Sequence, residues 1–227
     1  MNNRNIAIDG PAGAGKSTIA KTVAARLGLV YVDTGAMYRA MALYCIRQGI
    51  SADDREAISE ACRYLAVSLI YRDGSQEVWL NGEDVTPFLR GEDVGRMASA
   101  ISVYAPVREK LVELQRQIAA EKPVIMDGRD IGTVVLPDAV LKIYLTASVE
   151  ERAQRRYREL LQQGVAADPE VIRRDIRDRD DRDEHRSLSP LRRAADAVLL
   201  DSSDLTIEET ADRIIELYRG VTAEDAG

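Results

Sequence analysis

The chain has 227 residues, of which 45% are hydrophobic and 30% are charged, and its formal net charge at pH 7 is −7. This length and apolar content suit one compact α/β domain with insertions. The sequence lacks both a signal-peptide apolar region and a run of about 18 apolar residues that could span a membrane, so we expect a cytoplasmic protein. Two cysteines and one histidine are too few for a disulfide framework or a multi-histidine zinc site. The negative charge argues against a protein that coats nucleic acid.

Five short apolar segments predict buried strands, because each is followed by a helical pattern or a turn. They are residues 5–9, 29–33, 124–127, 140–145 and 197–200. Between them lie amphipathic segments, and the chain has no internal repeat or long linker. This alternation predicts an α/β fold with a doubly wound, five-stranded parallel sheet.

Two helix starts are predicted from capping boxes, in which two side chains satisfy each other's unpaired backbone N–H groups. Ser148 with Glu151 forms the first box and Thr206 with Glu209 the second.

Residues 67–85, VSLIYRDGSQEVWLNGEDV, differ from the rest of the chain. Strand-type residues are interrupted there by Asp73-Gly74 and Asn81-Gly82, which are signals for two-residue hairpin turns. The segment predicts a small antiparallel insert outside the main sheet.

The run GPAGAGKS at residues 10–17 fits the phosphate-loop pattern G-x-x-x-x-G-K-[ST]. It follows a predicted strand and leads into helical spacing at residues 18–27, as the mechanism requires. Its glycines let backbone N–H groups surround a polyphosphate, Lys16 supplies positive charge to the β- and γ-phosphates, and Ser17 offers an oxygen to Mg²⁺. The alternative is an ordinary glycine-rich turn. The expected ATP-binding residues are Gly10, Pro11, Ala12, Gly13, Ala14, Gly15, Lys16, Ser17 and Thr18.

Charged residues follow two further strands. The second strand ends in DTGAMYR, with Asp33 and Arg39, and the third in DGRD, with Asp127, Arg129 and Asp130. Ligands of open α/β sheets bind at the carboxyl ends of the strands. Either cluster alone could be a solvated turn, but two clusters at the edge that carries a phosphate loop indicate a substrate site.

The segment RRDIRDRDDRDEHR at residues 173–186 holds six arginines and six carboxylates. It could be a solvated helix laced with salt bridges. It also suits a lid whose arginines are held by carboxylates until a triphosphate arrives. The upstream run EERAQRRYR at residues 150–158 adds four more arginines.

With these motifs the chain closely resembles the bacterial cytidylate kinases, a family of nucleoside monophosphate kinases. The resemblance covers nearly the whole chain and rests on IAIDGPAGAGKST, DTGAMYR, DGRDIGTVV at residues 127–135, LKIYLTAS and RDDRD at residues 179–183. It implies an ATP-dependent kinase of pyrimidine nucleotide metabolism that converts CMP or dCMP to CDP or dCDP with Mg²⁺. It also implies a core of residues 1–38, 111–150 and 181–227, a monophosphate-binding insert at 39–110 and a lid at 151–180.

The resemblance further implies roles for individual residues. Arg39 and Arg129 would hold the acceptor phosphate, and Ser17 would bind the metal. Ser99, Arg108 and Asp130 would read the base, and Arg179 and Asp183 would approach the ribose. The full set of substrate-binding candidates is Thr34, Arg39, Ser99, Arg108, Arg129, Asp130, Arg179, Asp183 and Arg186. Apart from the resemblance, phosphoryl transfer needs positive charge on the transferring group, and the candidates for this catalytic role are Lys16, Arg129, Arg152, Arg156 and Arg186.

Three alternatives remain at the level of sequence. A related kinase could act on UMP, AMP or shikimate, although the hairpin insert argues against a shikimate-type enzyme. A GTPase switch is disfavoured because the guanine-reading N-K-x-D motif is absent. An RNA-binding role for residues 173–186 is weakened because that segment carries no net charge. We expect small-molecule nucleotides as partners, with no nucleic acid, membrane or obligate protein partner.

Overall fold

The computed structural model describes residues 4–72, 75–162 and 164–224. The chain divides into two compact units, one formed by residues 1–31 and 122–227 and the other by residues 32–121. Each unit has a hydrophobic core of its own.

A five-stranded sheet with the strand order β2-β6-β1-β7-β8 organises the first unit, and β2 carries the chain into the second. The five predicted strands are confirmed, with each end within one residue of its predicted position. They are β1 (Ile6–Asp9), β2 (Val30–Asp33), β6 (Val124–Gly128), β7 (Leu141–Thr146) and β8 (Val198–Asp201).

Parallel pairing joins β1 to β6, β1 to β7 and β7 to β8. The central strand β1 is apolar without alternation because it is buried on both faces, and Ile6, Ala7 and Ile8 are fully buried. Its last residue, Asp9, lies opposite Gly128 of β6 and Tyr144 of β7. The register therefore brings the carboxyl ends of these three strands to one edge, where the order of a doubly wound sheet places ligands.

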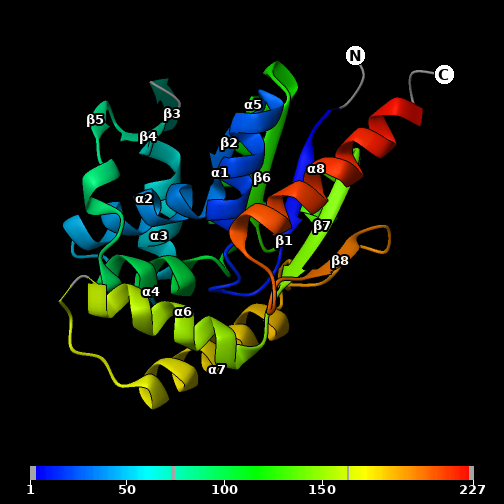
Figure 1. Cartoon of the computed structure of the whole chain (residues 1–227). Coiled ribbons are helices and arrows are strands. Elements are labelled where there is room, and N and C mark those ends of the chain that lie inside the picture. Colours follow the sequence, from blue (N-terminus) through cyan, green and yellow to red (C-terminus); the bar gives the residue numbers. More distant parts are fainter. Residues whose placement is uncertain (1–3, 73–74, 163, 225–227) are drawn as a thin grey trace. The chain divides into compact units, whose positions relative to one another are not determined.

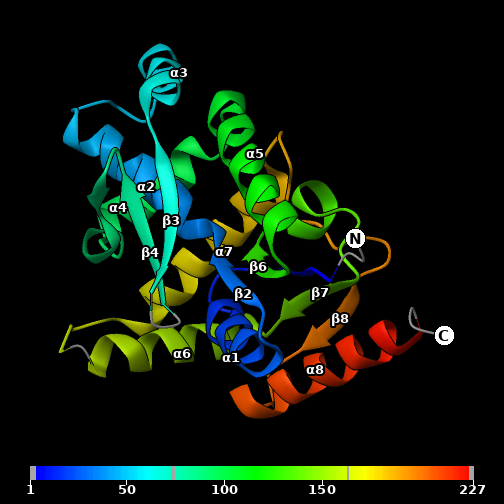
Figure 2. The same ribbon diagram turned by 90° about the horizontal axis from the view of Figure 1, so that it is seen from above.

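Helices α1 (Lys16–Leu27) and α8 (Ile207–Glu224) lie side by side on the sheet (Figures 1 and 2). Their apolar faces join the core of this unit. The predicted capping box before α8 is confirmed in both directions. The N–H of Glu209 donates to Oγ1 of Thr206 at 3.2 Å, and the N–H of Thr206 donates to Oε2 of Glu209 at 2.9 Å.

Helices α6 (Val149–Gln162) and α7 (Pro169–His185) form a pair in the same unit (Figure 1). Ala153, Ile172 and Ile176 form the buried contact between them. The predicted start of α6 is confirmed, since Oγ of Ser148 accepts the N–H of Glu151 at 3.1 Å. The reciprocal half of that box differs, because the N–H of Ser148 donates to Oγ of Ser203 at 2.9 Å and the Glu151 carboxylate pairs with Arg155.

The second unit is built from helices around a small sheet. Its core is formed by buried residues such as Met37, Met41, Ile58, Ile101 and Leu111. Its elements are α2 (Thr34–Arg47), α3 (Arg55–Tyr64), β3 (Val67–Arg72), β4 (Ser75–Leu80), β5 (Glu83–Asp84), a 3₁₀ turn (Thr86–Phe88), α4 (Glu92–Ile101) and α5 (Ala105–Glu121).

The predicted antiparallel insert is confirmed as the three-stranded sheet β3-β4-β5. Asn81 and Gly82 join β4 to β5 with φ angles of 50° and 86°. Two consecutive residues with positive φ make the tight turn whose twist suits a hairpin. The other predicted turn, Asp73-Gly74, lies outside the described residues.

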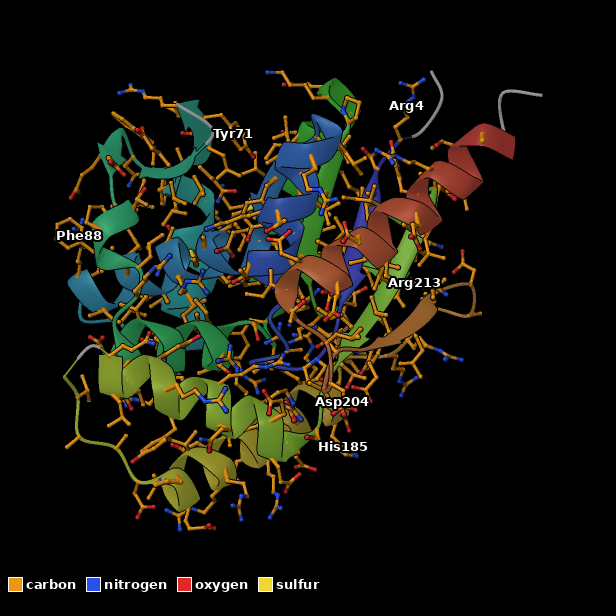
Figure 3. All side chains as sticks on the ribbon, viewed as in Figure 1. Arg4, Tyr71, Phe88, His185, Asp204 and Arg213 are labelled. Atoms are coloured by element: carbon orange, nitrogen blue, oxygen red, sulfur yellow. The ribbon has the colours of Figure 1, made fainter. Side chains whose placement is uncertain are left out.

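No helix in the described ranges is long and apolar enough to cross a membrane. Cys45 and Cys62 are buried free thiols, and burial raises the pKa of Cys45 to about 11. The single histidine, His185, lies at the exposed end of α7, beside Asp181 (Figure 3).

Candidate active site

The phosphate loop joins β1 to α1, and its backbone geometry requires glycine at two positions. A Cβ on Gly10 would lie 1.9 Å from the carbonyl oxygen of Leu145, so only glycine allows this approach. Gly15 has a φ of 84° and directly precedes α1. The first turn of this helix has N–H groups without partners inside the helix, and they suit an anion.

Lys16 is 5% exposed, and its Nζ donates a hydrogen bond to the carbonyl oxygen of Pro11 at 2.7 Å. Burial, together with the positive charge of Arg129, lowers its pKa to about 7, while the carboxylate of Asp127 opposes the shift. A bound anion would raise the pKa of Lys16 again, because it stabilises the charged form of the amine that burial disfavours.

Ser17, Asp127 and Tyr31 form a connected group. Oγ of Ser17 donates to Oδ2 of Asp127 at 2.9 Å, and the hydroxyl of Tyr31 donates to Oδ1 of the same carboxylate at 2.8 Å. The carboxylate and the serine hydroxyl are hard oxygen ligands on residues next to the phosphate loop. They therefore fit Mg²⁺, which is held by one or two protein oxygens together with phosphates and water.

Arg129 in the turn after β6 pairs with Asp183 of α7, with 2.7 Å between Nε and Oδ2. Burial alone would lower the pKa of Arg129, but the carboxylate of Asp183 holds that pKa above its ordinary value. Conversely, burial favours the neutral form of Asp183, but Arg129 keeps the pKa of Asp183 below its ordinary value. Both residues are thus charged in a buried pair.

Arg186 follows α7 and approaches the same turn. Its Nε donates to the carbonyl oxygen of Ser189 at 2.6 Å, and its Nη2 lies 3.5 Å from Oδ1 of Asp130. Both side chains of the Arg186–Asp130 pair are less than a tenth exposed. The exposed Arg179 contributes positive charge here, since it helps to lower the pKa values of Lys16 and Asp183.

The arginines of α6 differ in their surroundings. Arg152 is buried, and its guanidinium donates to the carbonyl oxygens of Ala147 and Ala12 and pairs with Asp180 at 2.7 Å. It thereby joins the phosphate loop to α6 and α7. Arg156 is half exposed and pairs with Glu159 of its own helix.

Arg155, which the sequence places in the predicted lid but not among the site candidates, lies beside the phosphate loop. Its Nη2 donates to the carbonyl oxygen of Ser202 at 2.7 Å, and a Cβ on Gly15 would lie 3.8 Å from its Nη1. The three-residue spacing from Arg152, which puts both side chains on one helix face, is the signal that could have found it.

In the second unit, Asp33 organises the start of α2. Its Oδ1 accepts the N–H of Ala36 at 2.9 Å, and its Oδ2 pairs with Nη2 of Arg39 at 2.9 Å. Nε of Arg39 is buried without a hydrogen-bond partner among the described residues. Gln76 of β4, which the sequence interpretation does not single out, accepts the backbone N–H of Asp33 at 2.9 Å.

Ser99 and Arg108 meet through Ser102, at the junction of α4 and α5. The carbonyl oxygen of Ser99 accepts the hydroxyl of Ser102 at 2.8 Å, and Nη1 of Arg108 donates to the carbonyl oxygen of Ser102 at 3.4 Å. Arg108 is 6% exposed, with its guanidinium 5.9 Å from the ring centroid of Tyr38. Tyr38 lies next to Arg39 in sequence and has no motif signal of its own.

The predicted site residues thus fall into two sets. The first unit holds Lys16, Ser17, Arg129, Asp130, Arg152, Arg156, Arg179, Asp183 and Arg186. The second unit holds Thr34, Arg39, Ser99 and Arg108.

Known proteins resemble this chain over nearly its whole length. The model of the cytidylate kinase family matches residues 6–220. A cytidylate kinase from Caldicellulosiruptor bescii is 48% identical, over 99% of this chain and 100% of the relative. One from Desulfitobacterium hafniense is 52% identical, over 95% and 93%.

A solved structure of an uncharacterized protein from Eubacterium ventriosum has a TM-score of 0.55 at 12% identity, covering 96% of this chain and 99% of that chain. This likeness shows a shared fold. The two cytidylate kinases, by contrast, share about half of their residues with this chain, and the family model spans the phosphate loop, the turn after β6 and α7. The chain therefore belongs to the cytidylate kinase family.

Proposed function

We propose that the chain transfers the γ-phosphoryl group of ATP to CMP or dCMP, giving ADP and CDP or dCDP. The observation that carries the proposal is the match to the cytidylate kinase family over residues 6–220. The arrangement of Lys16, Ser17 and Asp127 around the phosphate loop supports the ATP-dependent half of the reaction.

In this proposal, residues 10–18 bind the phosphates of ATP. Backbone N–H groups of the loop and of the first turn of α1 donate to the phosphate oxygens. Lys16 exchanges its hydrogen bond to the carbonyl oxygen of Pro11 for phosphate oxygens and brings a full positive charge to the transferring group.

Mg²⁺ would be held by Ser17, with Asp127 beside it, and when bound it neutralises negative charge on the β- and γ-phosphates. The hydroxyl of Ser17, which now donates to Asp127, would turn its oxygen toward the cation. Tyr31 keeps the carboxylate of Asp127 in place through its hydrogen bond to the other oxygen.

The acceptor nucleotide has proposed partners in each unit. In the second unit, Thr34 and Arg39 bind the acceptor phosphate, and the unpartnered Nε of Arg39 is a donor suited to it. Ser99 and Arg108 read the base. In the first unit, Arg129 binds the phosphate, Asp130 reads the base, and Arg179, Asp183 and Arg186 complete the acceptor contacts.

The chemical step needs no nucleophilic side chain. An oxygen of the acceptor phosphate attacks the γ-phosphorus of ATP, the bond to the β-γ bridging oxygen breaks, and ADP leaves with that electron pair. The protein contributes position and positive charge. We assign this charge to Lys16, Arg129 and Arg186, with Arg152 and Arg156 as further candidates.

The division of labour along the chain is also part of the proposal. Residues 151–180, which include most of α6 and most of α7, act as a lid, and residues 39–110 act as the monophosphate-binding insert. Closure of a lid excludes water that would otherwise accept the phosphoryl group. We further propose that the protein works in the cytoplasm on free nucleotides, without nucleic acid, membrane or obligate protein partner.

A coupled assay of ADP release tests the proposal. With ATP and Mg²⁺, we expect turnover of CMP and dCMP, weaker turnover of UMP, and none of AMP or shikimate. Turnover confined to AMP, UMP or shikimate would contradict the assigned acceptor, and ADP release without any acceptor would indicate a hydrolase.

A further inference from the structure

Asp9 is a buried carboxylate that the proposed reaction does not use. It is the last residue of β1, is 4% exposed, and directly precedes the phosphate loop. Its side chain nevertheless contacts the segment that follows β6. Oδ1 accepts the N–H of Ile131 and Oδ2 accepts the N–H of Gly132, each at 2.7 Å.

These two N–H groups open a π-helical turn, Ile131–Val135. The carbonyl oxygen of Asp130 accepts the N–H of Val135, and that of Ile131 accepts the N–H of Leu136, which are the long-range bonds of a π-helix. The first N–H groups of any helix have no partner within it. Asp9 supplies the acceptors, and so fixes the backbone immediately after Asp130.

The backbone of Asp9 itself is held independently of this side chain. It pairs with Gly128 on one side and with Tyr144 on the other, as part of the parallel sheet. A change in the carboxylate should therefore act on the turn after β6 more than on the phosphate loop that begins at Gly10.

Gly132 lies against the side chains of Asp9 and Lys142. A Cβ there would lie 3.4 Å from Oδ2 of Asp9, which is an ordinary contact distance, and 3.2 Å from Cδ of Lys142, which is tight. A larger residue at this position would therefore displace the flexible lysine side chain before the carboxylate.

We propose that Asp9 is a positioning residue, whose carboxylate fixes the turn that presents Arg129 and Asp130 to the acceptor nucleotide. The assignment of these two residues to the acceptor rests on the proposed function. The hydrogen bonds that the turn donates to the Asp9 carboxylate are independent of it.

Asp9→Asn tests the proposal, because the amide keeps the shape but replaces one acceptor oxygen with a donor that faces a backbone N–H. We expect KM for CMP to rise by at least about tenfold and KM for ATP to change by less than about threefold. Asp54→Asn is the matched control. Asp54 also accepts a backbone N–H at a helix start, from Ala57 in α3, and its substitution should leave both KM values unchanged.

Amide hydrogen exchange provides a readout that does not need turnover. In Asp9→Asn, we expect the amides of Ile131 and Gly132 to exchange at least about tenfold faster, while those of Ile125 and Met126 in β6 keep their protection. A purely structural role would loosen β6 as well. Inactivity of the wild-type protein toward CMP would refute the proposed function, whereas unchanged exchange at Ile131 and Gly132 would refute the role of Asp9.

Asp9→Ala provides a second variant, should Asp9→Asn fail to fold. We expect KM for CMP to rise with little change in KM for ATP, because the N–H groups of Ile131 and Gly132 lose both acceptor oxygens. Equal changes in the two KM values, or none, in a folded variant would overturn the proposal.

Discussion

The carboxylate of Asp183 in α7 lies 2.7 Å from Nε of Arg129, so one ion pair joins that helix to the turn after β6. Both side chains are largely buried, at 19% and 10% exposure. Removing one partner of a buried pair leaves an uncompensated charge, which costs far more than the loss of a surface pair.

Asp183→Ala should therefore destabilise the protein by about 3 kcal/mol, and urea denaturation measures this. The matched control is Glu216→Ala, which removes the exposed partner of Arg213 on α8 and should cost less than about 0.5 kcal/mol. Equal losses of unfolding free energy in the two variants would show that the buried pair with Arg129 contributes no more to stability than the surface pair.

ATP binding should take up protons through Lys16. Since burial lowers the pKa of Lys16 to about 7, the amine of the nucleotide-free protein is mostly neutral at pH 8. Bound phosphates raise the pKa, and the amine then binds close to one proton. Calorimetry at pH 8 in buffers of different ionisation enthalpy measures the uptake. Lys16→Ala, measured alongside, should remove it while the fold persists, and an identical uptake in that variant would assign the proton to another group.

The pH dependence of stability should report on Asp9. Burial raises the pKa of Asp9 to about 6, despite the hydrogen bonds from Gly132 and Ile131. An unfolded chain has the ordinary value near 3.8, so between these values the folded state holds a proton that the unfolded state has lost. The contribution of Asp9 to stability is therefore largest below pH 4 and declines as the pH rises through 6.

Asp9→Asn removes this titration. The wild-type free energy of unfolding, relative to that of the variant, should fall with increasing pH by up to about 1.4 kcal/mol per pH unit inside that window. Urea denaturation between pH 4.5 and 7 tests this. The charged or titratable groups that interact with Asp9 are Lys16, Asp130 and Tyr144. A difference that does not vary with pH would mean that Asp9 does not titrate there.

The two arginines of α6 that are candidates for catalysis should behave differently. Arg152→Ala removes a buried guanidinium that pairs with Asp180 and donates to the carbonyl oxygen of Ala12. Both the stability and the turnover should fall, and the turnover should fall by at least about tenfold. Arg156→Ala removes an exposed pair with Glu159 and should lower the stability by less than about 0.5 kcal/mol. If Arg156→Ala lowers kcat as strongly as Arg152→Ala does, Arg156 contacts the transferring group during turnover.

The sheet and the phosphate loop could be predicted from sequence because their signals are local. Each strand is a short apolar run next to a turn, and the Thr206 box closes within four residues. The box at Ser148 was only half predictable, because Ser203, which accepts the N–H of Ser148, lies 55 residues further along the chain.

The supporting residues of the site could not be predicted in the same way. Asp9 ends an apolar strand next to the phosphate-loop motif, Tyr31 stands inside another strand and Gln76 stands in a hairpin, and the sequence pattern does not indicate what any of the three contacts. Their contacts depend on the register between strands, as when Tyr31 reaches Asp127 across 96 residues. Likewise, Arg155 and Arg156 are neighbours in sequence, but they lie on different faces of α6. Arg155 contacts Ser202 beside the phosphate loop, whereas Arg156 pairs with Glu159 on the exposed side.

The choice between cytosine and uracil should depend on Asp130. Cytosine offers an amino donor at N4, whereas uracil has an acceptor at O4, so a carboxylate near this position favours cytosine and repels uracil. Asp130 is 6% exposed, and its Oδ1 lies 3.5 Å from Nη2 of Arg186. Arg129, by contrast, is paired with Asp183. Arg129 thus has a carboxylate partner other than Asp130.

Asp130→Asn, whose amide can rotate to donate to O4, should lower kcat/KM for CMP and narrow the ratio of CMP to UMP by at least about tenfold. A lost hydrogen bond to a charged group costs roughly 1.5 to 3 kcal/mol, which corresponds to a factor of about ten to a hundred. Steady-state kinetics with both nucleotides measures the ratio. If the variant instead loses CMP and UMP turnover by the same factor, Asp130 acts on the acceptor phosphate through Arg186, because a phosphate contact is common to both nucleotides and a base contact is not.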